Sequence, residues 1–353
     1  MTFTFNFDIE NSSSQSTDEV QDSTLSMEGT MSHSDNEKRN VIPFHWLDVT
    51  SESRIEDAKQ RIQDFSIVLE WKNGRKDMER DEERLLRVNM TSHPNQTPMY
   101  HTLEQCQTDL IPGTYEGGLK IWECSLDLCQ FLWKWKDQIP FTSILELGCG
   151  HGLPGCLVLR MALQQQELQR QQQPTIPFHV IFADFNDFVL SDVTLPNVLL
   201  NTTEWDWKQV LSSVSFGAGD WMELSERLMD IRMQQQNDNT TLRQGPSDME
   251  TVLFDLILAS ETTYTEKSCQ ETVYLLAKHL TVTGGWGLVA TKRYYFGCGG
   301  GSNAFRQAIE AVPERTENQR TYQLEGTVVE SYDNGTGNIR DIWKIGFKER
   351  LKH

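Results

Sequence analysis

From about residue 140 onward, short hydrophobic runs alternate with longer segments of helical periodicity. Short apolar runs bounded by turn-forming residues are typical of buried strands, and the segments between them are long enough for crossover helices. This alternation predicts βαβ units and a mostly parallel sheet. The strands are expected at residues 143–147, 180–183, 213–216, 254–259 and 286–291, and the pattern at 213–216 is the weakest.

The spacing of apolar side chains also predicts the helices that connect these strands, and two later runs predict a hairpin. Residues 322–332 and 340–348 have strand patterns and flank the turn-forming sequence Asp-Asn-Gly-Thr-Gly. The sequence therefore predicts an α/β sheet that ends in an antiparallel hairpin. The helices are expected at residues 124–136, 154–170, 187–201, 266–280 and 303–312.

The first 108 residues lack this alternation. Residues 1–40 carry eight acidic and two basic side chains and few apolar ones, so we expect a disordered acidic tail. The main domain is expected at residues 109–353, with polar surface insertions at 164–173, which is rich in glutamine, and at 234–246. Residues 41–108 are expected to form an N-terminal extension that packs partly on this main domain.

The composition narrows the class of protein. The 353 residues are 38% hydrophobic and contain no apolar run near the ~18 residues of a membrane span, so we expect no transmembrane segment. The first ten residues lack the basic and apolar regions of a secretory signal, which indicates an intracellular protein of the cytoplasm or nucleus. The seven cysteines form no closely spaced pair and the eight histidines are scattered, so neither a disulfide framework nor a metal site is expected.

The charge balance bears on the partner. A formal net charge of −19 arises from 51 acidic and 32 basic residues. Proteins that grip phosphate backbones usually carry a basic surface, whereas this chain would repel nucleic acid and attract basic proteins. We therefore expect a basic protein partner and no direct nucleic-acid binding.

The strongest chemical motif is a glycine-rich turn after the first predicted strand, in the sequence Leu-Glu-Leu-Gly-Cys-Gly-His-Gly. Gly148 and Gly150 can adopt positive φ, and without Cβ atoms they let a bulky ligand lie against the backbone. A tight turn without a ligand is the alternative for a glycine pattern alone. In nucleotide-binding sheets an acid at the end of the second strand binds ribose hydroxyls, and Asp184 ends the second predicted strand. Asp184 could instead cap the following helix.

With its neighbours, this turn resembles that of the class I, seven-β-strand methyltransferases that depend on S-adenosylmethionine. The turn has the form Gly-x-Gly-x-Gly, whereas nicotinamide-binding proteins favour Gly-x-Gly-x-x-Gly. Gly-Asp-Trp at 219–221 follows the third strand, and Ser-Glu-Thr-Thr-Tyr at 260–264 ends the fourth. The resemblance implies a seven-stranded Rossmann-like sheet with an antiparallel C-terminal hairpin, and S-adenosylmethionine as the cofactor.

Other segments make the resemblance more specific. The Glu-x-x-Tyr arrangement at 261–264 is similar to that of a branch that methylates proteins, and the Asn-Pro-Pro-Tyr motif of enzymes that methylate nucleic-acid amino groups is absent. Residues 109–125, 194–198 and 295–301 resemble segments of the protein-histidine methyltransferases. In that family the substrate is a histidine of a large-subunit ribosomal protein, methylated on the ring nitrogen distal to the chain.

The resemblance also implies which residues contact the cofactor. Trp122 and Glu123 would hold the methionine end, with Glu123 able to pair with the amino group or the sulfonium, and Trp221 would offer a flat face to adenine. Trp122 could equally anchor the core. The implied set is Ile121, Trp122, Glu123, Cys124, Ser125, Gly148, Gly150, Ala183, Asp184, Phe185, Gly219, Asp220, Trp221 and Ser260.

The substrate pocket is expected at the carboxyl ends of the fourth and fifth strands, where Glu261, Tyr264 and the loop 297–301 are the candidates. An imidazole is largely neutral at pH 7 and needs an acceptor for one ring N–H, so that the other nitrogen faces the methyl group. Tyr264 could instead be a packing residue. Two alternative functions are a lysine methyltransferase of the same branch, whose substrate must first lose a proton, and a non-catalytic scaffold.

Overall fold

The computed structural model of the chain describes residues 43–62, 66–70, 85–89, 110–111, 114–140, 142–169, 177–237, 253–317, 319–333, 335 and 337–350. The predicted tail at 1–40 and much of the predicted extension before residue 110 lie outside the described residues, as does most of the polar insertion at 234–246.

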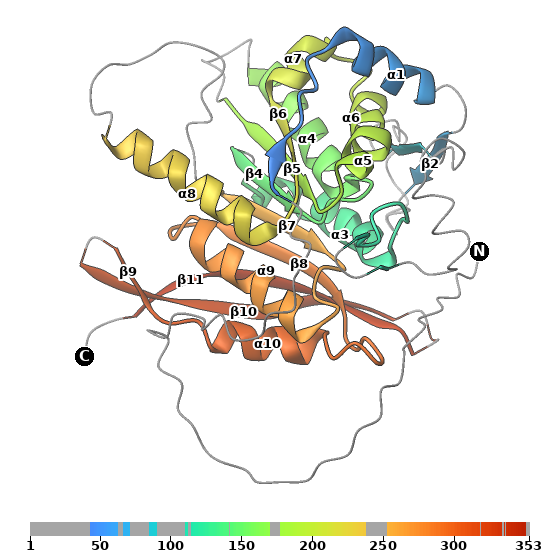
Figure 1. The fold of residues 1–353 in the computed structure, drawn as a ribbon. Coiled ribbons are helices and arrows are strands. Elements are labelled where there is room, and N and C mark those ends of the chain that lie inside the picture. Colours follow the sequence, from blue (N-terminus) through green and yellow to red (C-terminus); the bar gives the residue numbers. More distant parts are fainter. Residues whose placement is uncertain are drawn as a thin grey trace.

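A nine-stranded sheet forms the centre of the described part of the chain (Figure 1). Its strands are β1 (His45–Trp46), β4 (Ser143–Leu147), β5 (His179–Asp184), β6 (Val214–Ala218), β7 (Leu256–Ser260), β8 (Trp286–Lys292), β9 (Arg315–Glu317), β10 (Arg320–Asp333) and β11 (Ile339–Arg350). The spatial order is β1-β6-β5-β4-β7-β8-β11-β10-β9, and the five strands from β6 to β8 are parallel. The remaining four pair antiparallel with their neighbours. Strands β2 (Ser66–Glu70) and β3 (Leu85–Asn89) form a separate antiparallel pair.

The predicted α/β class, the parallel sheet and the C-terminal hairpin are confirmed. The sheet is larger than expected, because β1 and β9 extend the predicted seven strands at its two edges. Each of these strands has only two or three residues, which is too short to give a recognisable pattern of alternation.

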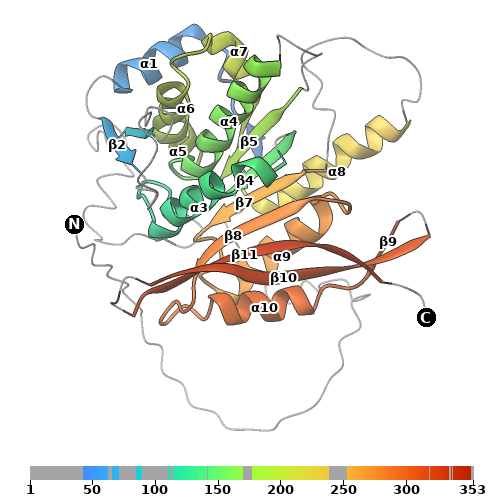
Figure 2. The ribbon, with the colours of Figure 1, turned by 180° about the vertical axis from the view of Figure 1, so that it is seen from behind.

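Helices cover both faces of the sheet. Helices α3 (Glu123–Lys134), α4 (Leu153–Gln169) and α6 (Leu195–Asn201) pack on one face, with α1 (Glu52–Ile62) outside α6. Helices α8 (Trp221–Asn237), α9 (Glu266–His279) and α10 (Ser302–Glu310) pack on the other, as the two opposite views show (Figures 1 and 2). The short helices α5 (Asp187–Val189) and α7 (Trp207–Ser212), a π-helical turn at Leu190–Thr194 and a 3₁₀ turn at Lys136–Gln138 complete the layers.

Strand β4 shows how the sequence fills these layers. Its five residues are all buried, with Ile144 in the core beneath α3 and α4, and Leu145 and Leu147 in the core beneath α8 to α10. Because successive side chains of a strand point to opposite faces, a strand covered on both sides needs a continuous apolar run. This requirement explains why the parallel strands were predictable from hydrophobicity alone.

Some helical segments were not predicted as such. Helix α8 was missed, residues 164–169 of the glutamine-rich insertion continue α4, and residues 234–237 continue α8. Glutamine is a good helix former, so a polar tract that follows a helix can extend it. In the predicted extension, Phe44 and Ile55 are buried in the two cores, so at least residues 43–62 pack on the sheet.

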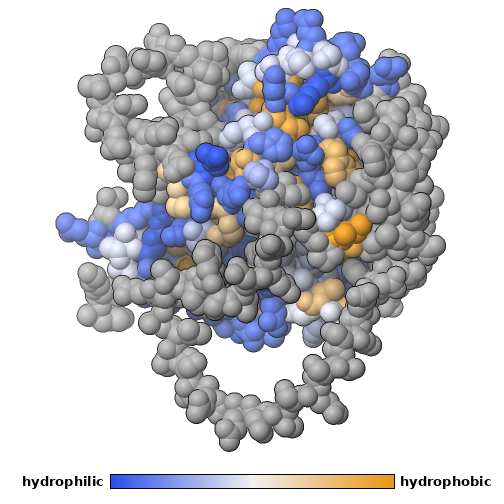
Figure 3. Space-filling model, in the orientation of Figure 1, coloured by the Kyte–Doolittle hydropathy of each residue, from blue (hydrophilic) through white to orange (hydrophobic). Residues whose placement is uncertain are grey.

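The surface of the described residues is mainly hydrophilic in the orientation of Figure 1, with small hydrophobic patches between polar side chains (Figure 3). None of the described helices is long and apolar enough to cross a membrane. The six cysteines among the described residues are all unpaired.

Candidate active site

The site is built around the turn between β4 and α4. Gly148 and Gly150 have φ angles of 58° and 50°, in the left-handed region that glycine tolerates best. A Cβ atom on Gly148 would lie 3.3 Å from the Trp221 ring, and one on Gly150 would lie 3.1 Å from the Gly118 carbonyl oxygen. The turn therefore presents bare backbone to a pocket bounded by Trp221 and Gly118.

Asp184, at the end of β5, holds this turn in place. Its carboxylate accepts hydrogen bonds from the backbone N–H of Gly150 at 2.9 Å and of Asn186 at 3.1 Å. Burial raises the pKa of Asp184 to about 6, although the backbone donors oppose the shift. Asp184 also lines the pocket, so the same residue orders the turn and forms part of the pocket wall.

A second set of contacts ties the turn to the helix that follows β5. The Thr194 hydroxyl donates to the Gly150 carbonyl at 2.6 Å, and the Asn197 amide donates to the His151 carbonyl at 2.9 Å. Thr194 ends the π-helical turn, a local irregularity that often occurs at functional sites. These bonds give a physical reason for the Thr-Leu-Pro-Asn-Val segment at 194–198.

Most of the expected site residues line one pocket beside this turn. Leu110, Gly117, Lys120, Ser268 and Glu271 also contribute to its wall. The expected residues that line it are Ile121, Trp122, Ser125, Gly148, Gly150, Asp184, Phe185, Asp220, Trp221, Ser260, Glu261 and Tyr264.

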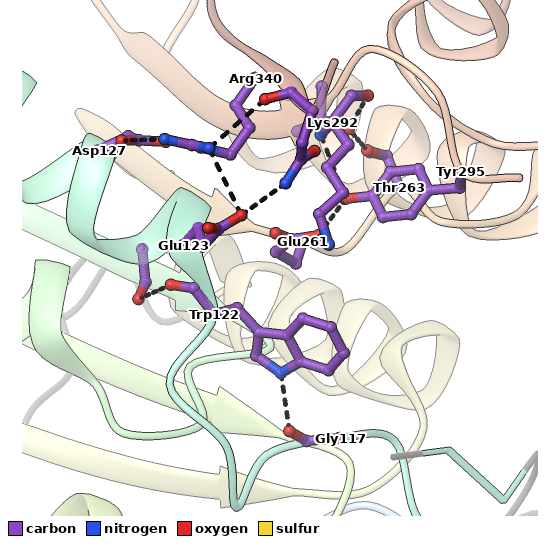
Figure 4. Close-up of polar contacts among 12 residues, drawn as sticks. Gly117, Trp122, Glu123, Asp127, Glu261, Thr263, Lys292, Tyr295 and Arg340 are labelled. Atoms are coloured by element: carbon purple, nitrogen blue, oxygen red, sulfur yellow. Dashed lines mark hydrogen bonds and ion pairs between the residues drawn. The ribbon is translucent and has the colours of Figure 1, made fainter. Parts of the chain in front are cut away.

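Glu123 lies elsewhere. Its Oε2 accepts a hydrogen bond from the Asn338 amide at 2.6 Å and lies 3.4 Å from the Arg340 guanidinium, both at the start of the C-terminal hairpin (Figure 4). Arg340 also pairs with Asp127 of α3. The Glu123 side chain is thus engaged by the C-terminal hairpin and does not line the pocket, and its contact with the methionine end of a cofactor stays a prediction.

Three other expected residues do not line the pocket but are next to lining residues in the chain. Cys124 is fully buried, and burial raises the pKa of its thiol well above the ordinary range. The Ala183 carbonyl accepts a hydrogen bond from the Cys149 N–H at 3.0 Å. Gly219 has a φ of 128°, and a Cβ there would lie 2.5 Å from the Phe44 backbone, so only glycine allows this approach.

The two tryptophans of the pocket wall differ in how their indole N–H groups are held. The Trp122 indole N–H donates to the Gly117 carbonyl at 2.9 Å (Figure 4). The Trp221 indole N–H is buried and has no hydrogen-bond partner among the described residues. Asp220 precedes it and caps α8 by accepting from the Met222 N–H at 2.8 Å. The cap fixes the ring of Trp221 at the first position of the helix.

A buried cluster stands at the carboxyl ends of β7 and β8 (Figure 4). Glu261 has a φ of 57°, a strained value for a residue with a side chain. Its Oε2 accepts a hydrogen bond from the Tyr295 hydroxyl at 2.5 Å and lies 3.4 Å from Lys292 Nζ. Lys292 Nζ also lies 5.2 Å from the centre of the Trp122 ring. Glu261, Lys292 and Tyr295 are each at most 9% exposed, so the cluster is shielded from solvent.

Tyr264 forms the neighbouring wall. Its hydroxyl donates to a carboxylate oxygen of Glu116. Burial raises the pKa of Tyr264 above its ordinary value, so the phenol stays protonated and remains a donor. The loop 297–301 does not line the pocket; it supports the wall, because the N–H of Gly300 donates to the Tyr264 carbonyl at 3.1 Å.

Sequence reasoning did not single out Glu116, Lys292 and Tyr295 as members of the site. Glu116 lies within the segment 109–125 that carries the family resemblance. Lys292 ends β8 and Tyr295 follows it, and the carboxyl end of β8 must lie beside that of β7 in a parallel sheet. This adjacency was the available signal.

The pocket wall is negatively charged. It carries five carboxylates (Glu116, Asp184, Asp220, Glu261 and Glu271) and one lysine, Lys120. Among the described residues, no group of three or more His, Cys, Asp or Glu side chains is placed to hold a metal ion. The excess of carboxylates in this wall suits a ligand with positive charge.

Comparison with curated proteins identifies the relatives of this chain. A Dictyostelium discoideum protein named histidine protein methyltransferase 1 homolog is 30% identical over 239 residues, which cover 68% of the chain and 60% of that protein. A Schizosaccharomyces pombe protein named histidine protein methyltransferase 1 is 34% identical over 226 residues, which cover 60% of the chain and 61% of that protein. The sequence of this chain is therefore similar to those of proteins named histidine protein methyltransferase 1.

A Bos taurus homolog of the same name is 32% identical over 225 residues, covering 58% of the chain and 51% of that protein. The chain thus spans between about half and three fifths of the length of these three relatives. No family model matches the chain.

Two solved structures are also similar to the chain. The N-methyltransferase NodS from Bradyrhizobium japonicum, in complex with S-adenosyl-L-homocysteine, is 13% identical with a TM-score of 0.35, covering 72% of this chain and all of that one. The glycopeptide N-methyltransferase MtfA, complexed with S-adenosyl-L-methionine, is 11% identical with a TM-score of 0.33, and the match covers 63% of this chain and 93% of that one.

Proposed function

We propose that this chain is an S-adenosylmethionine-dependent methyltransferase that methylates a histidine ring nitrogen of a basic protein. The observation that carries the proposal is how the two carboxylate oxygens of Glu261 are hydrogen-bonded. One carboxylate oxygen is held by Tyr295 and Lys292, and the other, Oε1, is buried without a hydrogen-bond partner among the described residues. The names of the relatives support histidine as the acceptor.

The residues of the pocket fit S-adenosylmethionine, which supplies an electrophilic methyl group on a positively charged sulfur when bound. The bare backbone of Gly148 lets a ligand approach the turn, and the adjoining Trp221 ring offers a face for adenine. The unpartnered Trp221 N–H is a donor that a polar ligand would satisfy. The carboxylate-rich wall complements a sulfonium and an ammonium group.

Histidine suits the proposed pocket because its ring needs orientation more than deprotonation. A neutral imidazole carries one N–H and one lone pair. Glu261 Oε1 would accept the N–H, so that the distal ring nitrogen turns its lone pair towards the methyl group. A neutral ring that accepted the methyl group would become an imidazolium, and the sulfonium would leave as a neutral thioether. The carboxylate of Glu261 would stabilise that charge until the proton leaves.

The neighbouring pair of Tyr264 and Glu116 would close the pocket around the ring. The protonated Tyr264 hydroxyl donates to Glu116, so neither side chain is free to swing into the space that the substrate needs. In this proposal Tyr264 shapes the pocket, and Glu261 contacts the reacting ring.

We infer that the substrate is a basic protein, and a large-subunit ribosomal protein fits this inference. The chain has a net charge of −19, and five carboxylates face the pocket. Ribosomal proteins are strongly basic, so charge complementarity would favour their encounter with this surface before RNA covers them.

The test replaces Glu261 with glutamine and uses basic proteins extracted from ribosomes as acceptors. Glu261→Gln should lower the rate of methylhistidine formation by about 10- to 100-fold, because a hydrogen bond to a charged group is lost at the reacting ring. Its affinity for S-adenosylmethionine should fall less than the rate does, because the other four carboxylates of the pocket wall remain.

The matched control is Glu266→Gln, which alters an exposed acid in the first turn of α9, outside the pocket wall. It should retain the rate of the unchanged protein. A Glu261→Gln variant with full activity would remove Glu261 from the mechanism, and methyl-lysine as the sole product would replace the histidine proposal with the lysine alternative.

A further inference from the structure

Two aromatic side chains stand out on the surface beside the pocket. Tyr294 is 62% exposed and Phe296 is 85% exposed, and their ring centres lie 6.4 Å apart. A single exposed aromatic residue is ordinary, but a neighbouring pair next to a concave site is typical of a contact surface. The pair lies on the segment that joins β8 to α10.

This segment is fixed to the pocket by the residue between the two rings. Tyr295 points inward, lines the pocket and donates to Glu261 at 2.5 Å. The Lys292 N–H lies 3.3 Å from the Tyr295 hydroxyl, and the Cys298 N–H donates to the Tyr295 carbonyl at 3.2 Å. Tyr294 and Phe296 are exposed to solvent and flank, in the chain, the residue that enters the pocket.

The charge of the neighbouring pocket wall favours a cationic occupant. Five carboxylates and one lysine, Lys120, line the pocket. Lys267 and Lys292 each pair with one of these carboxylates, and counting them still leaves five acids against three ammonium groups. Arg293, next to Tyr294, is paired with Asp341 at 2.7 Å, so its charge is compensated. Aromatic faces attract ammonium and guanidinium groups, and most strongly where the surroundings are negative.

We propose that Tyr294 and Phe296 form a subsite that receives a lysine or arginine side chain of the substrate polypeptide, close in sequence to the methylated residue. The inference rests on the proposed function, in that the occupant is the protein substrate. The subsite would make the protein favour a histidine that has a lysine or arginine close to it in sequence, in addition to the general attraction between an acidic protein and a basic one.

The test measures binding independently of turnover. The probe is a fluorescein-labelled peptide with one histidine flanked on each side by two lysines, and the matched peptide has glutamine in place of every lysine. Dissociation constants are measured by fluorescence anisotropy in the presence of saturating S-adenosylhomocysteine. The protein is the full chain, unchanged or carrying Tyr294→Ala together with Phe296→Ala.

We expect the unchanged protein to prefer the lysine peptide and the double variant to lose about fivefold of that preference. The double variant keeps the net negative charge that attracts any basic peptide. The loss of preference therefore measures the contribution of the two aromatic rings alone. The control, Val328→Ala with Val329→Ala, removes two exposed apolar side chains of β10 that lie outside the pocket wall and should keep the preference.

Three results would overturn the subsite: an unchanged preference in the double variant, an equal loss for both peptides, or a similar loss in the control. An equal loss would mean that the rings make only apolar contacts. Methylation of the lysine peptide by the unchanged protein is measured in parallel. A peptide that binds with the expected preference but receives no methyl group on histidine would refute the proposed function and leave the subsite standing.

Discussion

Glu146 provides a quantitative test of how the glycine turn is stabilised. Its side chain is 1% exposed, and its Oε2 accepts a hydrogen bond from the Gly155 N–H at 2.9 Å, while Oε1 has no partner among the described residues. Burial raises the pKa of Glu146 from the ordinary value of 4.5 to about 8. The folded protein therefore binds a proton here at neutral pH that the unfolded chain releases.

The consequence for stability follows from the direction of this shift. A carboxyl group with a raised pKa contributes its full stability below pH 4.5, and that contribution is lost as the pH rises towards 8. Each pH unit within this window costs about 1.4 kcal/mol, so Glu146 lowers the free energy of unfolding by about 3 kcal/mol at pH 7. Glu146→Gln keeps an acceptor for Gly155 and has no proton to lose.

We expect the stability advantage of Glu146→Gln over the unchanged protein to grow with pH, from less than about 1 kcal/mol at pH 5 to about 3 kcal/mol at pH 7. Urea unfolding followed by tryptophan fluorescence at both pH values measures the difference. Glu226→Gln, at an exposed position of α8, is the control and should show no such trend. A difference between Glu146→Gln and the unchanged protein that is the same at pH 5 and pH 7 would refute the reasoning.

Three further predictions concern the turn and the cluster. Tyr295→Phe removes the donor to Glu261 and should lower the methylation rate by about 10-fold or more, whereas Tyr322→Phe, on β10 and outside the pocket wall, should leave the rate unchanged in the same assay. Asp184→Asn should weaken S-adenosylmethionine binding by about 1.5 to 3 kcal/mol in calorimetry, because charge-assisted bonds to the turn are lost; unchanged affinity would exclude this role. Gly155→Ala should lower the free energy of unfolding, measured by urea unfolding, by about 1 to 3 kcal/mol, because the added Cβ would clash with Glu146 Oε2. A gain in stability would contradict this packing argument.

The elements and the turn that position the site were predictable because each depends on local physics. The β4 strand was predicted with the same bounds, 143–147, because a strand buried on both faces needs an apolar run. Gly148 and Gly150 were predictable because few residue types tolerate their φ angles. Asp184 was expected at the pocket, but its bond to Gly150 depends on how β5 is placed beside β4.

The contacts that could not be predicted join residues far apart in the chain. Glu123 was expected at the cofactor, yet its partner Arg340 is 217 residues away and reaches it only because β11 pairs beside β8. Helix α8 was missed because its pattern of apolar residues is weak, and only tertiary packing of residues such as Leu224 stabilises it. Local pattern therefore identified the scaffold, while the identity of the side chains that meet in the pocket depends on the assembled sheet.

The central claim is that this chain places a methyl group on histidine. The most direct measurement incubates the purified chain with isotopically labelled S-adenosylmethionine and basic proteins extracted from ribosomes, and then identifies the labelled residue by mass spectrometry after proteolysis. The account predicts label on the distal ring nitrogen of histidine, with loss of that label in Glu261→Gln. Label found only on lysine, or no transfer by a folded chain that binds S-adenosylmethionine, would contradict it.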